Sequence, residues 1–152
     1  MKKFIYLISP QKIDEKFYDT LRKVLQCKNV RFFQLRLKKI KKDKIVKIAK
    51  KIRKITRKFN VKLIINDHPN ISKITNADGC HLGQKDGSAK KANLNILKWA
   101  KRNIKKPIIA IGGINNSNYK KFIKCGAKYI ALSSYIWDNP KLKPEIAIRK
   151  FK

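Results

Sequence analysis

Short apolar segments alternate along this chain with longer amphipathic segments that are rich in lysine. The apolar runs have the length of β-strands and lie at residues 4–8, 31–37, 61–65, 79–82, 108–111 and 129–133. The longer segments space their apolar side chains as one face of a helix does, and they lie at residues 14–27, 43–59 and 93–104. Nearly continuous apolar strands that are each followed by a helix are typical of parallel sheets. The order therefore predicts an α/β fold with a parallel sheet covered by helices.

Shorter helical segments complete the pattern. Residues 70–76 form a short helix or turn, and a terminal helix begins at about Lys143. A polar cap within residues 115–117 starts a further helix that ends at Gly126. We count six βα units, and the length predicts a single domain over residues 1–152.

Lysine and arginine outnumber the acidic residues forty to nine, which gives a formal net charge of +31. Such a charge can bind nucleic acids by releasing counterions from phosphates. Only seven of the basic residues are arginine, the residue suited to reading phosphates in a fixed geometry, and lysines occur on every predicted helix. We therefore interpret the lysines mainly as solvated helix faces and keep nucleic-acid binding as a remote alternative. In either case the field should attract small anionic molecules.

The sequence indicates a cytoplasmic protein. It has no run of eighteen apolar residues, so we expect no membrane span. The first apolar run is about six residues long, which is too short for the apolar region of a secretory signal. Cys27, Cys80 and Cys125 lie far apart, and buried free thiols are favoured over a disulfide or a metal site.

Polar residues collect where the predicted strands end. In parallel α/β folds the carboxyl ends of the strands share one edge of the sheet, and ligands bind there. The candidates in chain order are Gln34, Arg36, Lys38, Asn66, Asp67, His81, Gln84, Asp86, Gly112, Gly113, Ser133 and Ser134. We interpret His68 and His81 as loop or structural residues, and Trp99 and Trp137 as packing residues.

Two aspartates, Asp67 and Asp86, each follow an apolar strand in a chain that has few carboxylates. Taken singly, each is also compatible with a turn or helix-cap role, and Arg36 and Lys38 with solvated cations on an edge strand. Together the four residues favour a Mg²⁺-pyrophosphate site, because Mg²⁺ takes one or two carboxylates and completes its shell with substrate phosphate oxygens. Gln34, Arg36 and Lys38 alternate along a strand, so their side chains are expected to point the same way.

A second anion site is predicted where the last two strands of the chain end. Gly112 and Gly113 let backbone amides approach a ligand ahead of a helix. Ser133 and Ser134 end the last strand. These two loops match the phosphate site that follows the last two strands of a (β/α)₈ barrel.

Five motifs, in order, resemble those of thiamine-phosphate synthase and its TenI-like relatives. They are QLRLK at 34–38, IND at 65–67, ADGCHLGQKD at 77–86, PIIAIGGIN at 107–115 and GAKYIALSS at 126–134. The resemblance implies a TIM-barrel-like fold and a transferase of thiamine biosynthesis. Its reaction would couple an aminopyrimidine diphosphate with a thiazole phosphate and release pyrophosphate.

The resemblance also assigns roles to residues of this chain. The residues implied to bind the pyrimidine substrate are Gln34, Arg36, Lys38 and Asn66, and of these Arg36 and Lys38 would act on the departing pyrophosphate. The implied Mg²⁺ ligands are Asp67 and Asp86. The residues implied to hold the thiazole phosphate are Gly112, Gly113, Ser133 and Ser134.

The chain departs from the family's pattern in two places. His68 stands where the family commonly has arginine. Only twenty residues separate Asp86 from Pro107, where the family carries roughly two further βα units. Because a closed barrel usually needs at least about 200 residues, we expect an incomplete TIM-barrel-like parallel sheet of about six βα units. This favours, as an alternative function, a TenI-like protein that binds a phosphate ligand without transferase activity, and it predicts a homodimer that covers the open edges.

Overall fold

In the computed structural model, residues 3–81, 94–103 and 107–152 are described, and within them the chain forms six strands and seven helices. The strands are β1 (Ile5–Ile8), β2 (Val30–Leu35), β3 (Lys62–Asn66), β4 (Gly79–His81), β5 (Ile109–Ala110) and β6 (Tyr129–Leu132). The helices are α1 (Glu15–Leu25), α2 (Lys42–Lys58), α3 (Pro69–Ile74), α4 (Leu94–Asn103), α5 (Tyr119–Lys124), α6 (Ser134–Trp137) and α7 (Pro144–Arg149).

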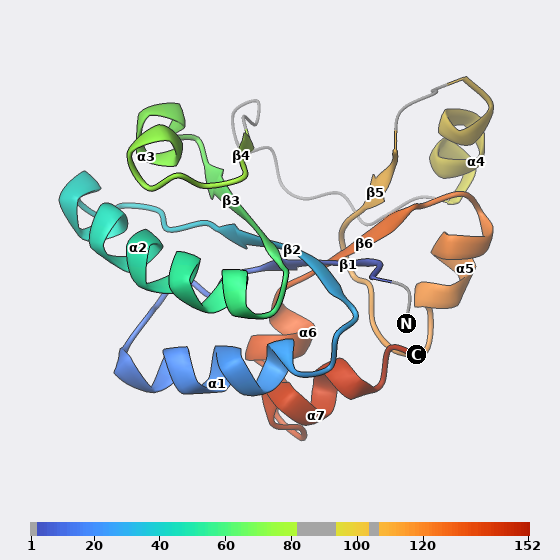
Figure 1. The fold of residues 1–152 in the computed structure, drawn as a ribbon. Coiled ribbons are helices and arrows are strands. Elements are labelled where there is room, and N and C mark those ends of the chain that lie inside the picture. The colour runs from blue at the N-terminus through green and yellow to red at the C-terminus, as the bar shows by residue number, and fades with distance from the viewer. Residues whose placement is uncertain (1–2, 82–93, 104–106) are drawn as a thin grey trace.

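All six strands belong to one parallel sheet, in the order β4-β3-β2-β1-β6-β5. The sheet curls, and the helices lie around its outer side, with α1, α6 and α7 beneath its centre (Figure 1). The prediction of a TIM-barrel-like α/β fold with six strands is confirmed. Within the described residues, β4 and β5 form the two ends of the sheet and are not paired with each other.

The outer face of the sheet carries the main core. Strand side chains such as Leu7, Phe33 and Ile130 have no exposed surface, and they pack in one cluster with the apolar stripes of the helices. The apolar stripe predicted for residues 43–59 forms α2, whose lysines lie on the solvent side. Asp14 caps the start of α1, because its side chain accepts a hydrogen bond of 2.9 Å from the Phe17 amide.

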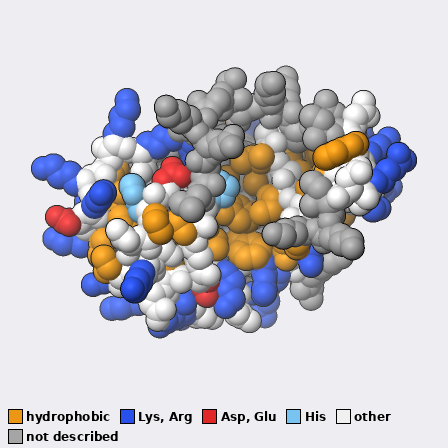
Figure 2. All heavy atoms as spheres, turned by 90° about the horizontal axis from the view of Figure 1, so that it is seen from above, with side chains coloured by type: hydrophobic (Ala, Val, Ile, Leu, Met, Phe, Trp, Pro, Cys, Tyr) orange, Lys and Arg blue, Asp and Glu red, His pale blue; other side chains and the backbone are white. Residues whose placement is uncertain are grey.

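The inner, concave face of the sheet is apolar as well. Tyr6, Phe32 and Tyr129 come from adjacent strands, and their ring centroids are 5.5 Å apart for the first pair and 5.1 Å apart for the second. Burial raises the pKa of Tyr6 to about 12. Toward the β5 end the face opens, where Ile109 is 42% and Ile111 is 52% exposed. Figure 2 looks down on this side: hydrophobic side chains gather at its centre, and lysines and arginines lie around its periphery.

The structure corrects several boundaries and one packing prediction. The β5 strand is only two residues long, although an apolar run over 108–111 predicted four. Trp99 is 60% exposed, so its prediction as a packing residue is wrong. Trp137 does pack: its ring lies 5.2 Å from that of Phe17, and its Nε1 donates to the Ile8 carbonyl at 2.6 Å. No helix in the described part of the chain is long and apolar enough to cross a membrane.

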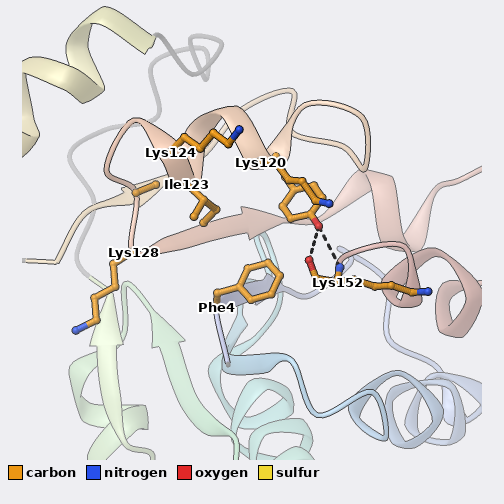
Figure 3. A pocket seen from close by; sticks show the side chains of 8 residues that line it. Phe4, Lys120, Ile123, Lys124, Lys128 and Lys152 are labelled. Atoms are coloured by element: carbon orange, nitrogen blue, oxygen red, sulfur yellow. Dashed lines mark hydrogen bonds between the residues drawn. The ribbon is translucent and has the colours of Figure 1, made fainter. Parts of the chain in front are cut away.

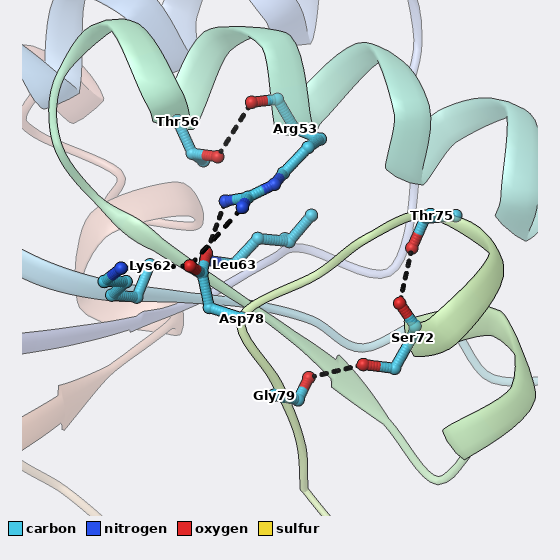
Figure 4. A network of polar contacts seen from close by, with 8 residues as sticks. All are labelled: Arg53, Thr56, Lys62, Leu63, Ser72, Thr75, Asp78 and Gly79. Carbon is cyan, nitrogen blue, oxygen red and sulfur yellow. Dashed lines mark hydrogen bonds and ion pairs between the residues drawn. The ribbon is translucent and has the colours of Figure 1, made fainter.

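A buried polar network attaches the edge strand β4 to its neighbours (Figure 4). Asp78 accepts hydrogen bonds from the Leu63 amide at 2.8 Å and from Lys62 at 3.1 Å, and it forms an ion pair with Arg53 of α2. The side chains of Asp78 and Arg53 are both only 14% exposed. Ser72 of α3 donates to the Gly79 carbonyl at 3.0 Å. These bonds fix the start of β4, which pairs on one side only among the described strands.

The network also sets the titration of Asp78. Burial alone would raise the pKa of this carboxyl, but the hydrogen bonds from Leu63 and Lys62 and the Arg53 charge outweigh burial and hold the pKa below its ordinary value of 3.8. A carboxyl with a depressed pKa in the folded state stabilises the fold above its ordinary pKa. That stabilisation is lost as the pH falls through the depressed value.

We expect Asp78→Ala to lower the free energy of unfolding by about 2–4 kcal/mol at pH 7, because the substitution leaves a nearly buried guanidinium without its carboxylate. Urea unfolding followed by circular dichroism measures this loss. The difference between the wild type and the variant should shrink as the pH is lowered below about 4.

The matched control is Asp19→Ala, which removes an ion pair with Arg22. The Asp19 side chain in this pair is 76% exposed. The free energy of unfolding of this variant should change by no more than about 0.5 kcal/mol. Equal effects of the two substitutions would contradict a structural role for the Asp78 network.

Candidate active site

A directed chain of side-chain hydrogen bonds crosses the carboxyl ends of β2 and β3. Gln34 Nε2 donates to Asn66 Oδ1 at 2.6 Å, and Asn66 Nδ2 donates to Asp67 Oδ2 at 2.6 Å. Gln34 is 3% exposed, so its amide is committed to this contact. Each amide is thereby fixed in one orientation, and the series ends in a carboxylate at the sheet edge.

Asp67 is held in an unusual backbone conformation. Its φ is +58°, in the left-handed region that few residues adopt other than glycine, asparagine and aspartate. The Asp67 amide donates to the His81 carbonyl at 2.8 Å, which ties this turn to the end of β4. Such strain is retained where the surroundings impose it, as at binding sites. The turn places the carboxylate between the ends of two strands.

Arg36 and Lys38 lie in the loop that follows β2. The prediction of one alternating strand through Lys38 is therefore wrong in part, because β2 ends at Leu35. The loop is held instead by the segment after β1: the Arg36 amide donates to Ser9 Oγ at 3.0 Å, and the Lys38 amide donates to Gln11 Oε1 at 3.1 Å. Arg36 is half-buried, and Lys38 is exposed.

The loop after β5 is shaped by two glycines. Gly112 has a φ of +104° and Gly113 a φ of +63°, conformations that a residue with a Cβ adopts only at a cost. Asn118 Nδ2 donates to the Gly113 carbonyl at 3.0 Å, and Asn115 Oδ1 accepts from the Asn118 amide at 3.1 Å. Asn118 is three residues beyond Asn115, and the helix α5 starts directly after it. Asn115 therefore caps the turn that leads into the helix.

The loop after β6 lies beside the glycine loop. Ser133 is half-buried and Ser134 is exposed, and the carbonyl of Ser133 accepts from the Ile136 amide at 2.9 Å. The Tyr135 hydroxyl donates to Asn116 Oδ1 at 2.8 Å, which links the two loops. The ends of β5 and β6 thus bring Gly112, Gly113, Ser133 and Ser134 into one region.

The candidate residues therefore form two groups at the same edge of the sheet, separated by the end of β1. Asp86 lies outside the described residues, so only one of the two predicted metal ligands can be placed. Among residues 3–81, 94–103 and 107–152, no group of three histidine, cysteine or acidic side chains is gathered as a protein-only metal site. One carboxylate at an open strand end fits Mg²⁺, which is often bound by one or two carboxylates with water and substrate phosphates.

The three cysteines are free and half-buried. Burial raises the pKa of the Cys80 thiol, which lies near Asp67 and His68, so Cys80 stays protonated and weakly nucleophilic at neutral pH. His68 precedes α3, and its carbonyl accepts from the Ser72 amide at 3.0 Å. The thiols are free as predicted, but they are half-buried where buried thiols were expected.

Comparison with known proteins decides the family. The family model described as thiamine monophosphate synthase matches the chain in two stretches, residues 5–94 and 88–136. The chain belongs to the thiamine monophosphate synthase family. A thiamine-phosphate synthase from Pelagibacter ubique is 43% identical, and the match covers 99% of this chain and 97% of that relative. A second such synthase, from Dictyoglomus thermophilum, is 31% identical over 78% of this chain and 74% of its own length.

Solved structures agree on the fold. A thiamine phosphate pyrophosphorylase from Pyrococcus furiosus superposes with a TM-score of 0.85 at 20% identity, over 98% of this chain and 93% of that chain. A geranylgeranylglyceryl phosphate synthase from Thermoplasma acidophilum gives a TM-score of 0.68 at 12% identity, over 99% of this chain and 91% of that chain. At these identities the likeness concerns the fold alone.

The alignment with the Pelagibacter relative shows that this family member is short. It extends over 200 positions, whereas this chain has 152 residues, so the relative has residues without a counterpart here. The family model matches in two stretches that meet and overlap at residues 88–94, between β4 and β5 in the chain. This is where the sequence predicts two missing βα units, and β4 and β5 are the two end strands of the described sheet.

Three supporting residues were missed by the sequence analysis. Ser9 and Gln11 hold the Arg36 loop, and Asp78 holds β4, although Asp78 lies within a motif that was recognised. The roles of Ser9 and Asp78 would have been revealed only by their burial, which is not visible in a single sequence.

We expect Ser9→Ala to lower the free energy of unfolding by about 1–2 kcal/mol, because the Arg36 amide loses its acceptor while Ser9 is only 3% exposed. Thermal unfolding followed by circular dichroism measures the change. Thr20→Ala is the control, since the Thr20 hydroxyl bonds only a carbonyl of its own helix. A Ser9 variant as stable as this control would show that Ser9 does not hold the loop.

Proposed function

We propose that this protein catalyses the coupling of an aminopyrimidine diphosphate with a thiazole phosphate in thiamine biosynthesis, releasing pyrophosphate. The observation that carries the proposal is the hydrogen-bonded series Gln34–Asn66–Asp67 at the strand ends, in a chain 43% identical to a thiamine-phosphate synthase. The family membership suggests the reaction and the roles of the residues, and the geometry at the strand ends supports them.

The first group of residues handles the diphosphate. Gln34 and Asn66 have fixed amide orientations, so they position the substrate rather than exchange protons. Arg36 and Lys38 offer cations to the diphosphate, whose oxygen takes the electron pair when the bond to the pyrimidine methylene carbon breaks. Asp67 and Asp86 would hold Mg²⁺, which neutralises charge on the leaving pyrophosphate.

The second group of residues holds the nucleophile. The backbone at Gly112 and Gly113 and the side chains of Ser133 and Ser134 would bind the phosphate of the thiazole. The thiazole nitrogen then forms a bond to the pyrimidine methylene carbon. No covalent bond to the protein is required, so the placement of the two substrates is the main contribution of the chain.

The shortened sheet favours a second candidate function: binding of a thiazole phosphate or of thiamine phosphate without turnover. The observation behind it is the pair of sheet ends at β4 and β5, which leaves the concave face open. The two functions are distinguished by one assay in which binding and turnover are both measured.

We expect the purified protein to form thiamine phosphate from both substrates in the presence of Mg²⁺. Asp67→Asn should lower kcat/KM by about 100-fold or more, because the amide keeps the shape of the turn but removes a charge from the metal site. Its melting temperature should stay within about 3 °C of the wild type, since asparagine also tolerates a left-handed φ. Product is quantified by liquid chromatography.

Asp43→Asn, an acidic residue in the first turn of α2, is the control and should keep full activity. If the wild type forms no product while thiamine phosphate raises its melting temperature, the binding function replaces the synthase function. If there is neither product nor a shift in melting, both are excluded.

We also propose that the protein forms a homodimer through the β5 end of the sheet. Ile109 and Ile111 are large, apolar and half exposed there, and β5 pairs with β6 alone among the described strands. Two copies of a chain with a charge of +31 repel each other. Salt should therefore strengthen the dimer.

We expect sedimentation equilibrium to give a dimer at 0.5 M NaCl, where the Debye length is about 4 Å. Ile111→Lys should shift the protein to the monomer, because it places a cation on the exposed apolar edge. Ile146→Lys, on the 40% exposed Ile146 of α7, should leave the dimer intact. A monomeric wild type would exclude the dimer.

A further inference from the structure

A cavity lies at the opposite end of the sheet from the candidate active site. It has a volume of about 470 Å³, and we call it the foot pocket; it is lined by Phe4, Tyr119, Lys120, Ile123, Lys124, Ala127, Lys128 and Lys152 (Figure 3). Phe4 immediately precedes β1 and Lys128 immediately precedes β6. The pocket is therefore separated from the carboxyl ends of these strands by a strand length, roughly 13 Å at about 3.3 Å per residue.

The floor of the foot pocket is apolar and ordered. The rings of Phe4 and Tyr119 are stacked, with centroids 5.9 Å apart and an angle of 10° between their planes. The Tyr119 hydroxyl donates to the main-chain oxygen of Lys152 at 2.6 Å and accepts from the Lys152 amide at 3.1 Å. Because that hydroxyl is already satisfied, Tyr119 offers the pocket carbon surface rather than a polar group.

The rim of the foot pocket is basic. Lys120 and Lys124 are four residues apart on α5 and so lie on one side of that helix. Lys128 and Lys152 lie at other sides of the opening (Figure 3). No acidic residue is among the lining residues. The flexible stems of these lysines allow their ammonium groups to reach a ligand held on the floor.

Another hollow on the surface of the protein serves as a comparison for the foot pocket. It lies between α1 and α2 and is also lined by lysines and arginines, but it includes Glu15 and Asp19. There Lys51 pairs with Glu15 at 2.8 Å, and Arg22 pairs with Asp19. That hollow keeps an excess of basic residues, but two of its six cations are paired with carboxylates, and its lining is mostly charged. At the foot pocket the basic rim is combined with an apolar floor, and no acidic side chain is among the described lining residues.

We propose that the foot pocket binds an anionic amphiphile: a small molecule with a flat aromatic body and one phosphate or carboxylate group. The volume is within the usual range of small-molecule sites, about 300–1,000 Å³. The floor offers few hydrogen-bonding groups, so it suits a hydrocarbon ring better than a sugar. The basic rim supplies the attraction for the anionic group. The proposal does not depend on the reaction proposed above.

The test uses 1-naphthyl phosphate as the probe, with binding measured by isothermal titration calorimetry and its location by amide shifts in NMR spectra. We expect a Kd of about 10–200 µM, which is typical for a ligand of this size. The shifted amides should belong to Phe4 and to residues 119–128. Naphthalenemethanol, which lacks the charge, and inorganic phosphate, which lacks the ring, should each bind at least tenfold more weakly.

The Lys120→Glu/Lys124→Glu double variant should weaken binding of the probe at least tenfold. Lys54→Glu/Lys58→Glu is the matched control: it has the same spacing on a helix, makes the same change in net charge and lies at the other hollow. Equal weakening by the two double variants would mean that only net charge matters, and would overturn the proposal.

The active site is excluded by a further variant. Arg36→Ala should leave the affinity for naphthyl phosphate unchanged, because Arg36 lies at the other end of the sheet. A loss of binding in this variant, or amide shifts centred on Gly112 and Gly113, would place the probe at the candidate active site and overturn the proposal. Binding of naphthalenemethanol or inorganic phosphate as tight as that of the probe would overturn it too.

Discussion

The site depends on the parallel pairing of the strands. Because β3, β2, β1 and β6 run in the same direction, all their carboxyl ends reach one edge of the sheet. The side chains of Gln34 and Asn66 can meet only because adjacent strands present them on the same face. The turn at Asp67 and the loop at Gly112 then start from fixed positions. Candidate residues far apart in the chain are thereby brought to one edge of the sheet, and contacts such as Tyr135–Asn116 then link neighbouring loops.

The shortening of the family's chain has different consequences for the two sides of the sheet. The outer core is continuous, with helices packed over residues such as Leu7 and Ile130. The inner face, which a closed barrel would surround, keeps its apolar rings but is partly open near Ile111. The two groups of candidate residues flank the end of β1 and border the two ends of the sheet, because Asp67 is bonded to the end of β4 and Gly112 follows β5. Both groups nevertheless follow strands that are paired, since β3 pairs with β4 and β5 pairs with β6.

The sequence was sufficient to predict the order of the elements and that the described candidate residues gather toward the carboxyl ends of the strands, because periodicity and strand ends are local signals. It could not predict where β2 stops, since the termination at Leu35 depends on Ser9 and Gln11 from another segment. It also failed for Trp99, which was expected to pack because it is a large aromatic residue but is 60% exposed. The buried face of α4 carries Leu97 and Ala100 instead.

The central position of β1 has a consequence for synthesis on the ribosome. Its two neighbours are β2, which follows soon after it, and β6, which ends at Leu132. At about 5–20 residues per second, one edge of β1 waits roughly 6–25 s for its partner strand. During that interval a hydrophobic strand edge is open to pairing with other nascent chains. The high positive charge of the lysine-rich helices keeps such chains apart by repulsion, which gives this composition a role before the fold is complete.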